Sequence, residues 1–330
     1  MKILLHSGHY KLIEKSGVGR AIKHQMKALE LNNIPYTTNP KESFDIIHIN
    51  TIFPESYLLS KKAKRQGKMV VYHAHSTEED FKNSFLFSNQ LAPLFKKWIS
   101  KCYSSADLIV TPTPYAKELL DSYGLGKPVV AISNGIDLDF FKRNEEDAVR
   151  FRERFHLARE DKVIIAVGLY IERKGILDFV ELAKRLPQYK FIWFGYTNLN
   201  TVPGKVRTAV ETKLDNLTFA GYVSPDVLKQ AYCGSDLFLF PTYEETEGIV
   251  LLEALAMKLP ILIRDIPIYH KWLVDGVNIY KAKDIDQFQS KITAILEKKV
   301  PSLVEMGYKV AGERDLKTIG RQLAECGMSI

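Results

Sequence analysis

Short runs of apolar and β-branched residues recur along the chain and alternate with stretches of helical periodicity. Turn-forming residues bound these runs, and we predict ten β-strands, at residues 2–7, 45–50, 69–75, 107–112, 128–133, 163–168, 190–195, 217–221, 237–242 and 260–265. Strands that alternate with helices are typical of parallel sheets covered by helices on both faces. The pattern therefore predicts an α/β fold.

The ten predicted strands fall into two sets of five. Between the sets, residues 138–161 are highly charged and show no strand pattern. A chain of 330 residues exceeds the roughly 250–300 residues that a single core usually supports, so we expect two domains. We place the link in 138–161, between doubly wound domains at 1–140 and 141–308. Ligands are then expected at the carboxyl ends of the strands that face the gap.

Charge and composition narrow the partners and the compartment. The chain has 46 basic and 39 acidic residues, a net charge of +7, which favours an anionic partner such as phosphate, nucleic acid or an anionic bilayer. A hydrophobic content of 46% and a charged content of 26% exclude a disordered chain and a polytopic membrane protein. The first apolar run is too short for a signal peptide, and three widely separated cysteines suggest neither disulfides nor a zinc site, which fits a reducing cytosol.

The strongest local signal lies at 241–260, where a predicted strand ends, acidic residues and a glycine follow, and a helix begins. Gly248 permits a close backbone approach, and the exposed amides at the start of the helix can bind a diphosphate. Glu253 lies about one turn into this helix, where a carboxylate can accept hydrogen bonds from two sugar hydroxyls. The alternative is that Glu245 and Glu253 only favour the helix start electrostatically.

A second signal follows the strand at 163–168. Gly168 ends this strand, and Arg173 and Lys174 come before a helix that we predict to start near Gly175. Two adjacent cations at a strand end can neutralise the charge that develops on a leaving diphosphate. The alternative is a solvated basic turn.

A third signal is the glycine pair after the first strand. Gly17 and Gly19 predict a compact turn before a helix that starts near Arg20. The turn lacks the third glycine and the acidic residue of a dinucleotide-binding fingerprint, and a lone Gly-x-Gly is a weak signal. We interpret it as a loop that lets an acceptor approach the backbone.

Two histidines stand in the strand at 69–75. His73 and His75 are two residues apart, so their side chains should point to the same face of the strand. A metal site needs a third ligand, and none stands at a suitable spacing. The pair therefore does not predict a metal site.

Four motifs occur in the order found in glycosyltransferase family 4, and through them the chain resembles that family over nearly its whole length. They are SGVGR at 16–20, ISNGID at 132–137, VGLYIERKG at 167–175, and the pair Glu245 and Glu253 with seven residues between them. The resemblance implies retaining transferases with the GT-B fold, in which two Rossmann-like domains face a cleft. The ERKGI form is similar to the subgroup that glycosylates diacylglycerol in Gram-positive bacteria.

The resemblance also implies roles for individual residues. Glu253 would hold the ribose of the nucleotide, and Glu245 would lie by the donor sugar. Arg173 and Lys174 would bind the diphosphate, and His75 would orient the donor sugar by hydrogen bonding. The implied catalytic set is therefore His75, Arg173, Lys174 and Glu245.

Two larger sets complete the implied site. Its donor-binding residues are Gly168, Arg173, Lys174, Glu245, Gly248, Ile249, Val250 and Glu253, and its acceptor side comprises Gly17, Gly19, Arg20 and His75. The family usually has arginine where this chain has Leu169, and Arg173 is the candidate to take its place in the site. No cofactor and no metal are implied, because the two cations would supply the charge that a divalent ion supplies elsewhere. A terminal helix within 309–330, with apolar Ile319 and Leu323, would return to the first domain.

An anionic membrane surface is a further expected partner. Residues 82–106 mix large apolar side chains with lysines, and 61–68 add five positive charges. Each basic residue near an anionic leaflet contributes about 1 kcal/mol of attraction. We predict an interfacial helix whose membrane-facing residues are Lys96, Lys97, Trp98 and Lys101. The alternative is a core-packed helix with a solvated basic edge.

These inferences together predict a retaining transferase that moves glucose or galactose from a UDP-sugar to a membrane lipid. We expect a monoglycosyl-diacylglycerol as acceptor and an α-linked diglycosyl lipid, of the kind that anchors lipoteichoic acid, as product. The enzyme would be cytoplasmic and peripheral on the inner face of the cell membrane. One alternative is transfer to a polyprenyl-linked or soluble glycan in capsule or wall assembly. A nucleic-acid-binding protein is a distant alternative that leaves the glutamate pair unexplained.

Overall fold

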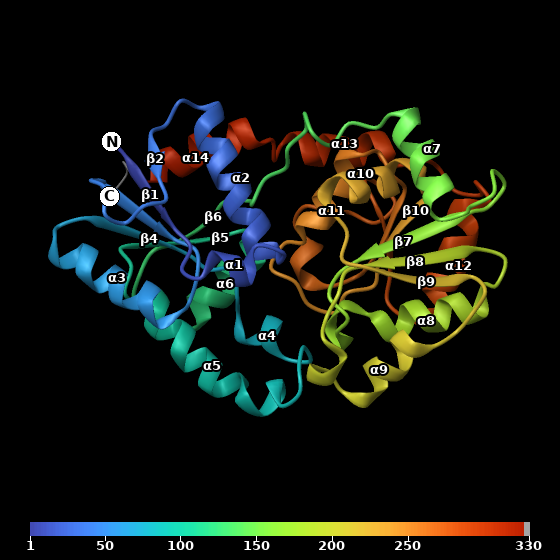
Figure 1. The fold of residues 1–330 in the computed structure, drawn as a ribbon, viewed down its shortest axis with the longest axis horizontal. Helices are drawn as coiled ribbons and strands as arrows, with labels where there is room; N and C mark the ends of the chain where they lie inside the picture. The colour runs from blue at the N-terminus through green and yellow to red at the C-terminus, as the bar shows by residue number, and fades with distance from the viewer. Residues whose placement is uncertain (327–330) are drawn as a thin grey trace.

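The computed structural model describes residues 1–326 and has two lobes, each built on a six-stranded parallel sheet (Figure 1). The strands of the first sheet are β1 Ile3–His6, β2 Tyr36–Thr37, β3 Ile46–Ile49, β4 Met69–His73, β5 Leu108–Thr111 and β6 Val129–Ala131. The helices of this lobe are α1 Tyr10–Ile13, α2 Gly17–Leu31, α3 Pro54–Arg65, α4 Glu78–Phe81, α5 Ser88–Tyr103 and α6 Pro114–Ser122.

The second sheet repeats this plan. Its strands are β7 Val163–Val167, β8 Lys190–Phe194, β9 Leu217–Gly221, β10 Leu237–Phe240, β11 Ile261–Arg264 and β12 Tyr280–Ala282. The helices that follow the first lobe are α7 Glu145–Arg154, α8 Ile176–Arg185, α9 Gly204–Glu211, α10 Pro225–Gly234, α11 Ile249–Ala256, α12 Ile285–Leu296, α13 Val304–Gly312 and α14 Leu316–Cys326. Short 3₁₀ turns are η1 Glu172–Lys174, η2 Leu199–Thr201 and η3 Pro267–Tyr269.

All ten predicted strands are present within one or two residues of their expected bounds. Strands such as β3, β5 and β10 are buried at every position, because helices cover both faces of each sheet. The prediction missed β2 and β12, which have two and three residues and lie at sheet edges. Such short strands carry too few residues for a pattern and depend on the neighbouring strand for their hydrogen bonds.

The strand order decides where ligands can bind. The second sheet has the order β12-β11-β10-β7-β8-β9, so its strand order reverses between β7 and β10. The first sheet has the order β2-β1-β3-β4-β5-β6 and reverses between β1 and β3. At a reversal the loops that leave neighbouring strands diverge and open a crevice at the carboxyl ends. The loops after β7 and β10 are therefore the expected ligand-binding segments of the second lobe.

The chain crosses between the lobes at two adjacent places. Ile136 N donates to Arg314 O at 2.9 Å, and Leu316 N donates to Ile136 O at 3.2 Å, so the outgoing and returning segments run side by side. The predicted link at 138–161 also contains a helix, α7, which packs on α10 of the second lobe. The chain therefore crosses near Ile136, just before that stretch, and α7 within the stretch already belongs to the second lobe.

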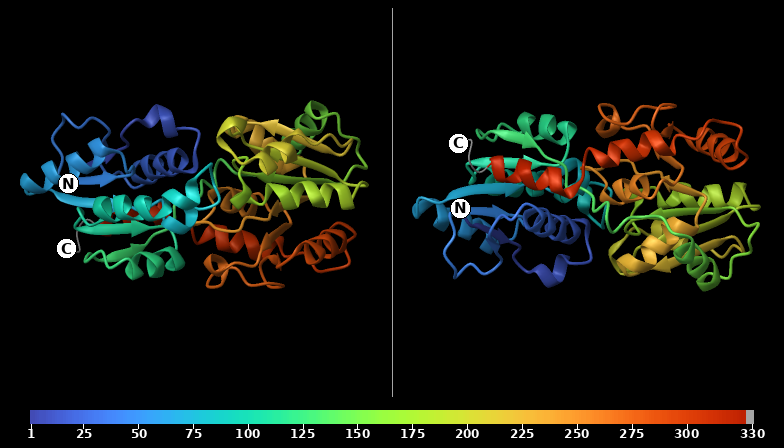
Figure 2. Two further views of the ribbon diagram at one scale, coloured as in Figure 1. Left: turned by 90° about the horizontal axis from the view of Figure 1, so that it is seen from below. Right: turned by 90° about the horizontal axis from the view of Figure 1, so that it is seen from above.

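The returning terminal helix is confirmed. Helix α14 packs on α2 of the first lobe, whereas α13 packs on α11 of the second. The right view of Figure 2 shows the red end of the chain reaching back into the first lobe. A Cβ atom at Gly320 would lie 2.2 Å from Ala28 O, so the two helices approach closely because position 320 is glycine. The helix that returns to the first lobe begins at Leu316, whereas the sequence predicted its start at 309. The last four residues of the predicted segment, 327–330, lie outside the described residues.

Candidate active site

A buried ion pair joins the loops that leave β7 and β10. Lys174 Nζ contacts Glu245 Oε1, and their side chains are only 15% and 9% exposed. Gly168 lies beside the pair, since a Cβ atom there would stand 3.4 Å from Lys174 Cγ. Burial lowers the pKa of Lys174; it acts to raise the pKa of Glu245, but the charges of Lys174 and Arg173 bring that pKa below its ordinary value. Three predicted donor-side residues are thus brought together at the strand-order reversal.

Helix α11 begins next to this pair. Gly248, which precedes its first residue, has a φ of 88°, in the left-handed region that favours glycine. The first amides of an α-helix have no acceptor within the helix, so the amides of Ile249 and Val250 can bind an anion. These predicted donor-side amides therefore follow Glu245 by four and five positions, at the start of α11.

Glu253 connects the two lobes. Its fully buried carboxylate accepts a hydrogen bond from Tyr232 Oη at 2.9 Å and forms an ion pair with Arg20 of α2. The structure thus places a predicted donor-side residue, Glu253, against a predicted acceptor-side residue, Arg20. Sequence reasoning assigned both positions but not their contact, because the two residues are 233 positions apart.

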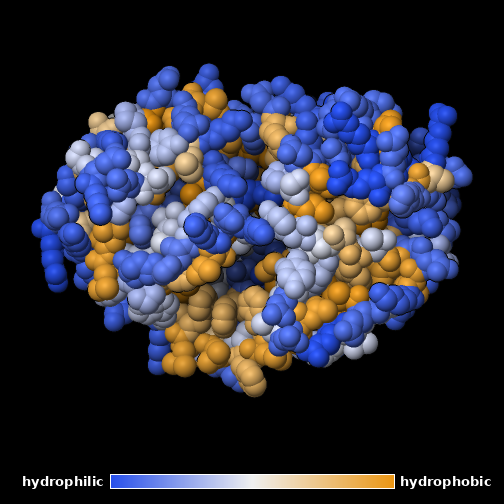
Figure 3. Space-filling view, viewed as in Figure 1, coloured by the Kyte–Doolittle hydropathy of each residue, from blue (hydrophilic) through white to orange (hydrophobic). Residues whose placement is uncertain are grey.

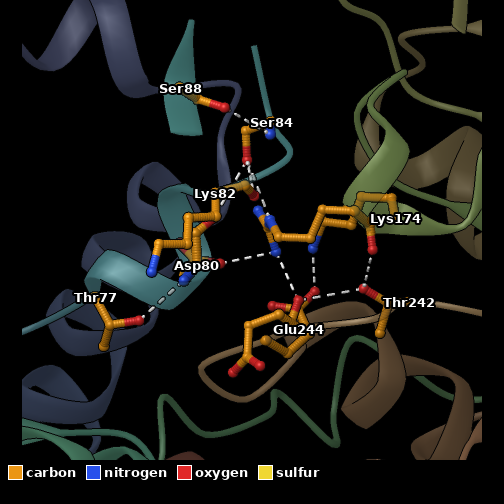
Figure 4. A network of polar contacts seen from close by, with 10 residues as sticks. Thr77, Asp80, Lys82, Ser84, Ser88, Lys174, Thr242 and Glu244 are labelled. Carbon is orange, nitrogen blue, oxygen red and sulfur yellow. Dashed lines mark hydrogen bonds and ion pairs between the residues drawn. The ribbon is translucent and has the colours of Figure 1, made fainter. Parts of the chain in front are cut away.

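Arg173, predicted to bind the diphosphate with its neighbour, points toward the first lobe. Its Nη1 lies 2.8 Å from Asp80 Oδ1 and donates to Glu244 O at 2.7 Å, and its Nε donates to Ser84 Oγ at 3.2 Å. Figure 4 shows Asp80, Ser84 and Glu244 converging on this network. In this structure Arg173 holds the two lobes together, and its contact with a diphosphate stays a prediction.

A further inter-lobe contact was missed by the sequence analysis. Glu247 is buried and accepts hydrogen bonds from Ser133 Oγ, from Asn134 N at 2.9 Å and from Asn134 Nδ2 at 2.8 Å. The loop before α11 thereby holds the ISNGID motif at 132–137. Two clues were in the sequence: an acidic residue next to Gly248, and a motif without an assigned role.

The glycine pair differs from its predicted form. Helix α2 begins at Gly17 and not near Arg20, and the Ser16 side chain caps it by accepting from Gly19 N at 3.3 Å. A Cβ atom at Gly19 would lie 2.3 Å from Ile13 O, so the chain's own α1–α2 turn requires this glycine. The proposed reason for the glycines, the approach of an acceptor to the backbone, is therefore not needed to explain Gly19.

His75 follows β4 by two residues, and Figure 1 shows that β4 ends on the side of the first lobe that faces the second. Its ring stacks on that of His73, with centroids 5.9 Å apart and planes inclined by 16°, which confirms that both side chains point to one face. Its Nε2 lies 2.9 Å from Asn50 Oδ1. Burial lowers the pKa of His75 to about 4, so the ring is neutral near pH 7.

Trp98 corrects one membrane prediction. The indole Nε1 donates to Ile52 O at 2.7 Å, and the ring packs on Tyr57 with centroids 5.9 Å apart. Trp98 thus belongs to the packing between α5 and the start of α3, because a half-buried indole finds its hydrogen-bond acceptor inside the lobe. The alternative reading, a core-packed position, holds for this residue.

The lysines of α5 have separate environments. Lys96 lies 3.2 Å from Glu78 and over the ring of Tyr123, and Lys101 lies over the ring of Tyr57. Lys97 is exposed. Of the three lysines predicted to face the membrane, only Lys97 is exposed without a partner among the described residues.

Large apolar side chains are exposed just before these lysines. They are Phe85, Leu86, Phe87, Leu91 and Leu94, between 38% and 69% exposed. Figure 3 shows apolar surface gathered along the lower edge, where Figure 1 places the start of α5. We call these five residues the apolar edge. None of the helices within residues 1–326 combines the length and apolar character needed to cross a bilayer.

Two other features lie apart from the predicted site. A cavity of about 520 Å³ opens near the amino ends of β10 and β11, lined among others by Asp236 and Ile261, and none of the predicted site residues lines it. Among residues 1–326, no group of three or more histidine, cysteine, aspartate or glutamate side chains is placed to hold a metal ion.

Comparison with known proteins identifies the family. The family described as "Glycosyl transferases group 1" matches residues 147–311, and "Glycosyltransferase Family 4" matches residues 38–140. A processive diacylglycerol alpha-glucosyltransferase of Acholeplasma laidlawii is 42% identical over 98% of this chain and 97% of its own length. An alpha-galactosylglucosyldiacylglycerol synthase of Streptococcus pneumoniae is 29% identical over 79% of this chain and 71% of its own.

Solved structures agree on the fold. The Anabaena protein HepE, in complex with UDP and glucose, has a TM-score of 0.77 with 18% identity over the whole of both chains. A sucrose-phosphate synthase of Thermosynechococcus elongatus has a TM-score of 0.79 with 16% identity, over 99% of this chain and 98% of its own. With its two facing Rossmann-like lobes and its returning helix, this chain is a GT-B glycosyltransferase and belongs to glycosyltransferase family 4.

Proposed function

We propose that the chain transfers glucose or galactose from a UDP-sugar to a glycosyl-diacylglycerol, with retention, to form an α-linked diglycosyl lipid. The observation that carries the proposal is the Lys174–Glu245 pair, held beside the start of α11 at the strand-order reversal. The relative at 42% identity, which matches over nearly the full length of both chains, is named for alpha-glucosyl transfer to diacylglycerol. HepE, which has the same fold, was solved with UDP and glucose.

The site has the charges that such a transfer needs. When the bond between the anomeric carbon and the β-phosphate oxygen breaks, negative charge develops on UDP. Lys174 and the amides of Ile249 and Val250 supply positive charge and donors for it, and preorganised charges of this kind lower the barrier most. The acceptor hydroxyl oxygen bonds to the anomeric carbon from the face that UDP leaves, and its proton passes to a β-phosphate oxygen. Front-side displacement of this kind needs no protein nucleophile, and it retains the α configuration.

Nucleotide binding must rearrange Glu253. One of its oxygens is bound by Tyr232 and the other by Arg20. A ribose diol offers two hydroxyl donors to a carboxylate, so the proposed complex needs the oxygen that Arg20 now contacts. We therefore expect Arg20 to move when the donor binds, which would link occupancy of the second lobe to the position of α2.

The apolar edge is the proposed membrane contact. Phe85 to Phe87 and the start of α5 project large apolar side chains, and the exposed Lys97 follows on the same helix. Insertion of apolar side chains together with attraction of lysines to anionic lipid is the pattern of interfacial segments. We propose that this edge holds the enzyme on the inner face of the membrane, where a lipid acceptor can reach the site.

Radiolabelled donors test the proposal directly. Purified protein is incubated with UDP-glucose or UDP-galactose and with vesicles that contain diacylglycerol or monoglucosyl-diacylglycerol, and the lipids are then extracted. We expect label in a diglycosyl lipid that an α-glycosidase releases. Lys174→Ala should lower product formation at least about a hundredfold. Lys205→Ala, which removes an exposed lysine paired with Glu172, is the matched control and should not.

Two results would contradict the proposal. Label that appears only in a soluble or polyprenyl-linked glycan would support the alternative of capsule or wall assembly. Label that only a β-glycosidase releases would contradict retention.

A further inference from the structure

A row of five polar side chains runs through the first lobe and ends at His75. It consists of His48 on β3, His73 on β4, Gln25 on α2, Asn50 after β3, and His75. All but His75 are at most 5% exposed. We call this group the polar row. Because these side chains are buried, each must find its hydrogen-bond donors and acceptors among its neighbours.

The hydrogen bonds of the polar row form one connected path. Gln25 Nε2 donates to Asn50 Oδ1 at 2.8 Å and lies 3.1 Å from His73 Nδ1, and Asn50 Nδ2 donates back to Gln25 Oε1 at 3.0 Å. His73 Nε2 lies 3.0 Å from His48 Nδ1. At the other end, His75 Nε2 lies 2.9 Å from Asn50 Oδ1.

The two amides determine which nitrogen of each ring carries the proton. Gln25 Nε2 is a donor, so His73 Nδ1 must accept and His73 carries its proton on Nε2. That proton is donated to Nδ1 of His48. Asn50 Oδ1 can only accept, so His75 must carry its proton on Nε2. The Nδ1 atom of His75 is then a lone-pair acceptor.

We propose that Gln25 and Asn50 are positioning residues that hold His75 in its Nε2–H tautomer. They act through this one hydrogen bond and do not touch the substrate. The Nδ1 atom of His75 is thereby restricted to accepting a hydrogen bond, and a sugar hydroxyl is a matching donor. Because the ring is neutral, no second proton competes for this nitrogen near pH 7.

The polar row contains residues to which the sequence motifs assigned no role. Asn50 follows β3 at the strand-order reversal of the first sheet, and Gln25 is buried on α2 five residues after Arg20. The row ends at His48 Nε2, which has no hydrogen-bond partner among the described residues. A buried donor without a partner lowers the stability of the folded protein by about 1–3 kcal/mol. If the polar row had no function, we would not expect this destabilising group to be present.

Nitrogen NMR tests the tautomers without any substrate. In protein labelled with ¹⁵N-histidine, two-bond ¹H–¹⁵N correlations distinguish the two tautomers of each of the eight histidines. His75→Gln assigns the signal of interest. We expect His75 and His73 both as Nε2–H tautomers in the wild type. If both amides were rotated, every tautomer in the row would reverse, and an Nδ1–H tautomer at His75 would overturn the proposal.

Two variants separate the members of the row. In Gln25→Glu the new carboxylate can only accept, so His73 should change to the Nδ1–H tautomer while Asn50 still accepts from His75. In Asn50→Leu the acceptor for His75 is lost, so both tautomers of His75 should appear. An unchanged His73 tautomer in Gln25→Glu would overturn the proposal even if Asn50→Leu does not fold.

The kinetic part of the test rests on the proposed function, whereas the NMR part does not. Asn50→Leu should lower kcat about tenfold or more, which corresponds to about 1.4 kcal/mol in the barrier, with the affinity for UDP within about twofold of wild type. Ser105→Ala, which deletes a buried hydrogen bond to Ser60 in the same lobe, is the control and should leave kcat unchanged. Unchanged kcat in folded Asn50→Leu would refute the positioning role. If the wild-type protein shows the expected tautomers but no glycosyl transfer, only the proposed function is refuted.

Discussion

Replacing Lys174 with alanine tests the centre of the proposed site. Its ammonium group is the cation nearest to Glu245, and the two side chains are 15% and 9% exposed. A cation that stabilises charge developing on a leaving phosphate acts mainly in the transition state, so we expect kcat to fall at least about a hundredfold, or about 2.7 kcal/mol. The substitution also leaves a buried carboxylate without its partner, which costs about 3 kcal/mol of folding free energy.

These two effects can be separated by a second substitution. The double variant Lys174→Ala and Glu245→Gln has no unpaired charge, so its thermal unfolding should return close to that of wild type while kcat stays at least about a hundredfold lower. Initial rates with labelled UDP-sugar and melting temperatures are measured for wild type, both variants and the Lys205→Ala control. Turnover within about threefold of wild type in a folded Lys174→Ala protein would refute the assignment of Lys174 to the leaving diphosphate.

Three further predictions address the nucleotide, the metal and the membrane. Glu253→Gln should weaken UDP binding measured by calorimetry, because an amide accepts less strongly from ribose hydroxyls than a carboxylate; unchanged affinity would count against the ribose assignment. Transfer should persist in excess EDTA, because Lys174 supplies positive charge at the diphosphate, and activity lost in EDTA but regained with Mg²⁺ or Mn²⁺ would show this prediction to be wrong. Sedimentation with vesicles should need anionic lipid, should weaken several-fold in high salt, and should fall in Phe87→Asn, which removes a 69% exposed side chain at a left-handed backbone position that asparagine tolerates. If the wild type and Phe87→Asn bind equally to neutral and to anionic vesicles, the apolar edge is not a membrane contact.

Some features of the site followed from local sequence alone. The ten main strands are short apolar runs with defined ends, so their positions could be predicted without knowing what covers them. Gly248 and Glu253 lie within one strand–loop–helix segment, and their relation to the start of α11 depends only on helix geometry. The same holds for the stacked pair His73 and His75, because side chains alternate along a strand.

For other residues the sequence predicted a role but not the contacts that the structure shows. Arg173 is next to Lys174 in sequence, yet η1 turns its guanidinium toward Asp80 and Ser84 of the other lobe. Trp98 belongs to an amphipathic helix, and periodicity cannot say whether its indole meets lipid or the backbone of Ile52. In both cases the residue that the side chain contacts lies far away in the sequence, so the contact could not be predicted from the local pattern.

The α/β class, the two sets of strands and the family could be predicted from the sequence, and so could the loops that carry the candidate donor-side residues. Those properties are local, since strand patterns, glycine positions and motif order can be recognised within short segments. The contacts between distant segments became known only from the three-dimensional structure: Arg20 with Glu253, Glu247 with Asn134, and Gln25 with Asn50 next to His75. Each of these contacts joins residues at least 25 positions apart, and hydrogen bonds and ion pairs form only within a few ångströms, so the packing of the helices and lobes had to bring the partners together.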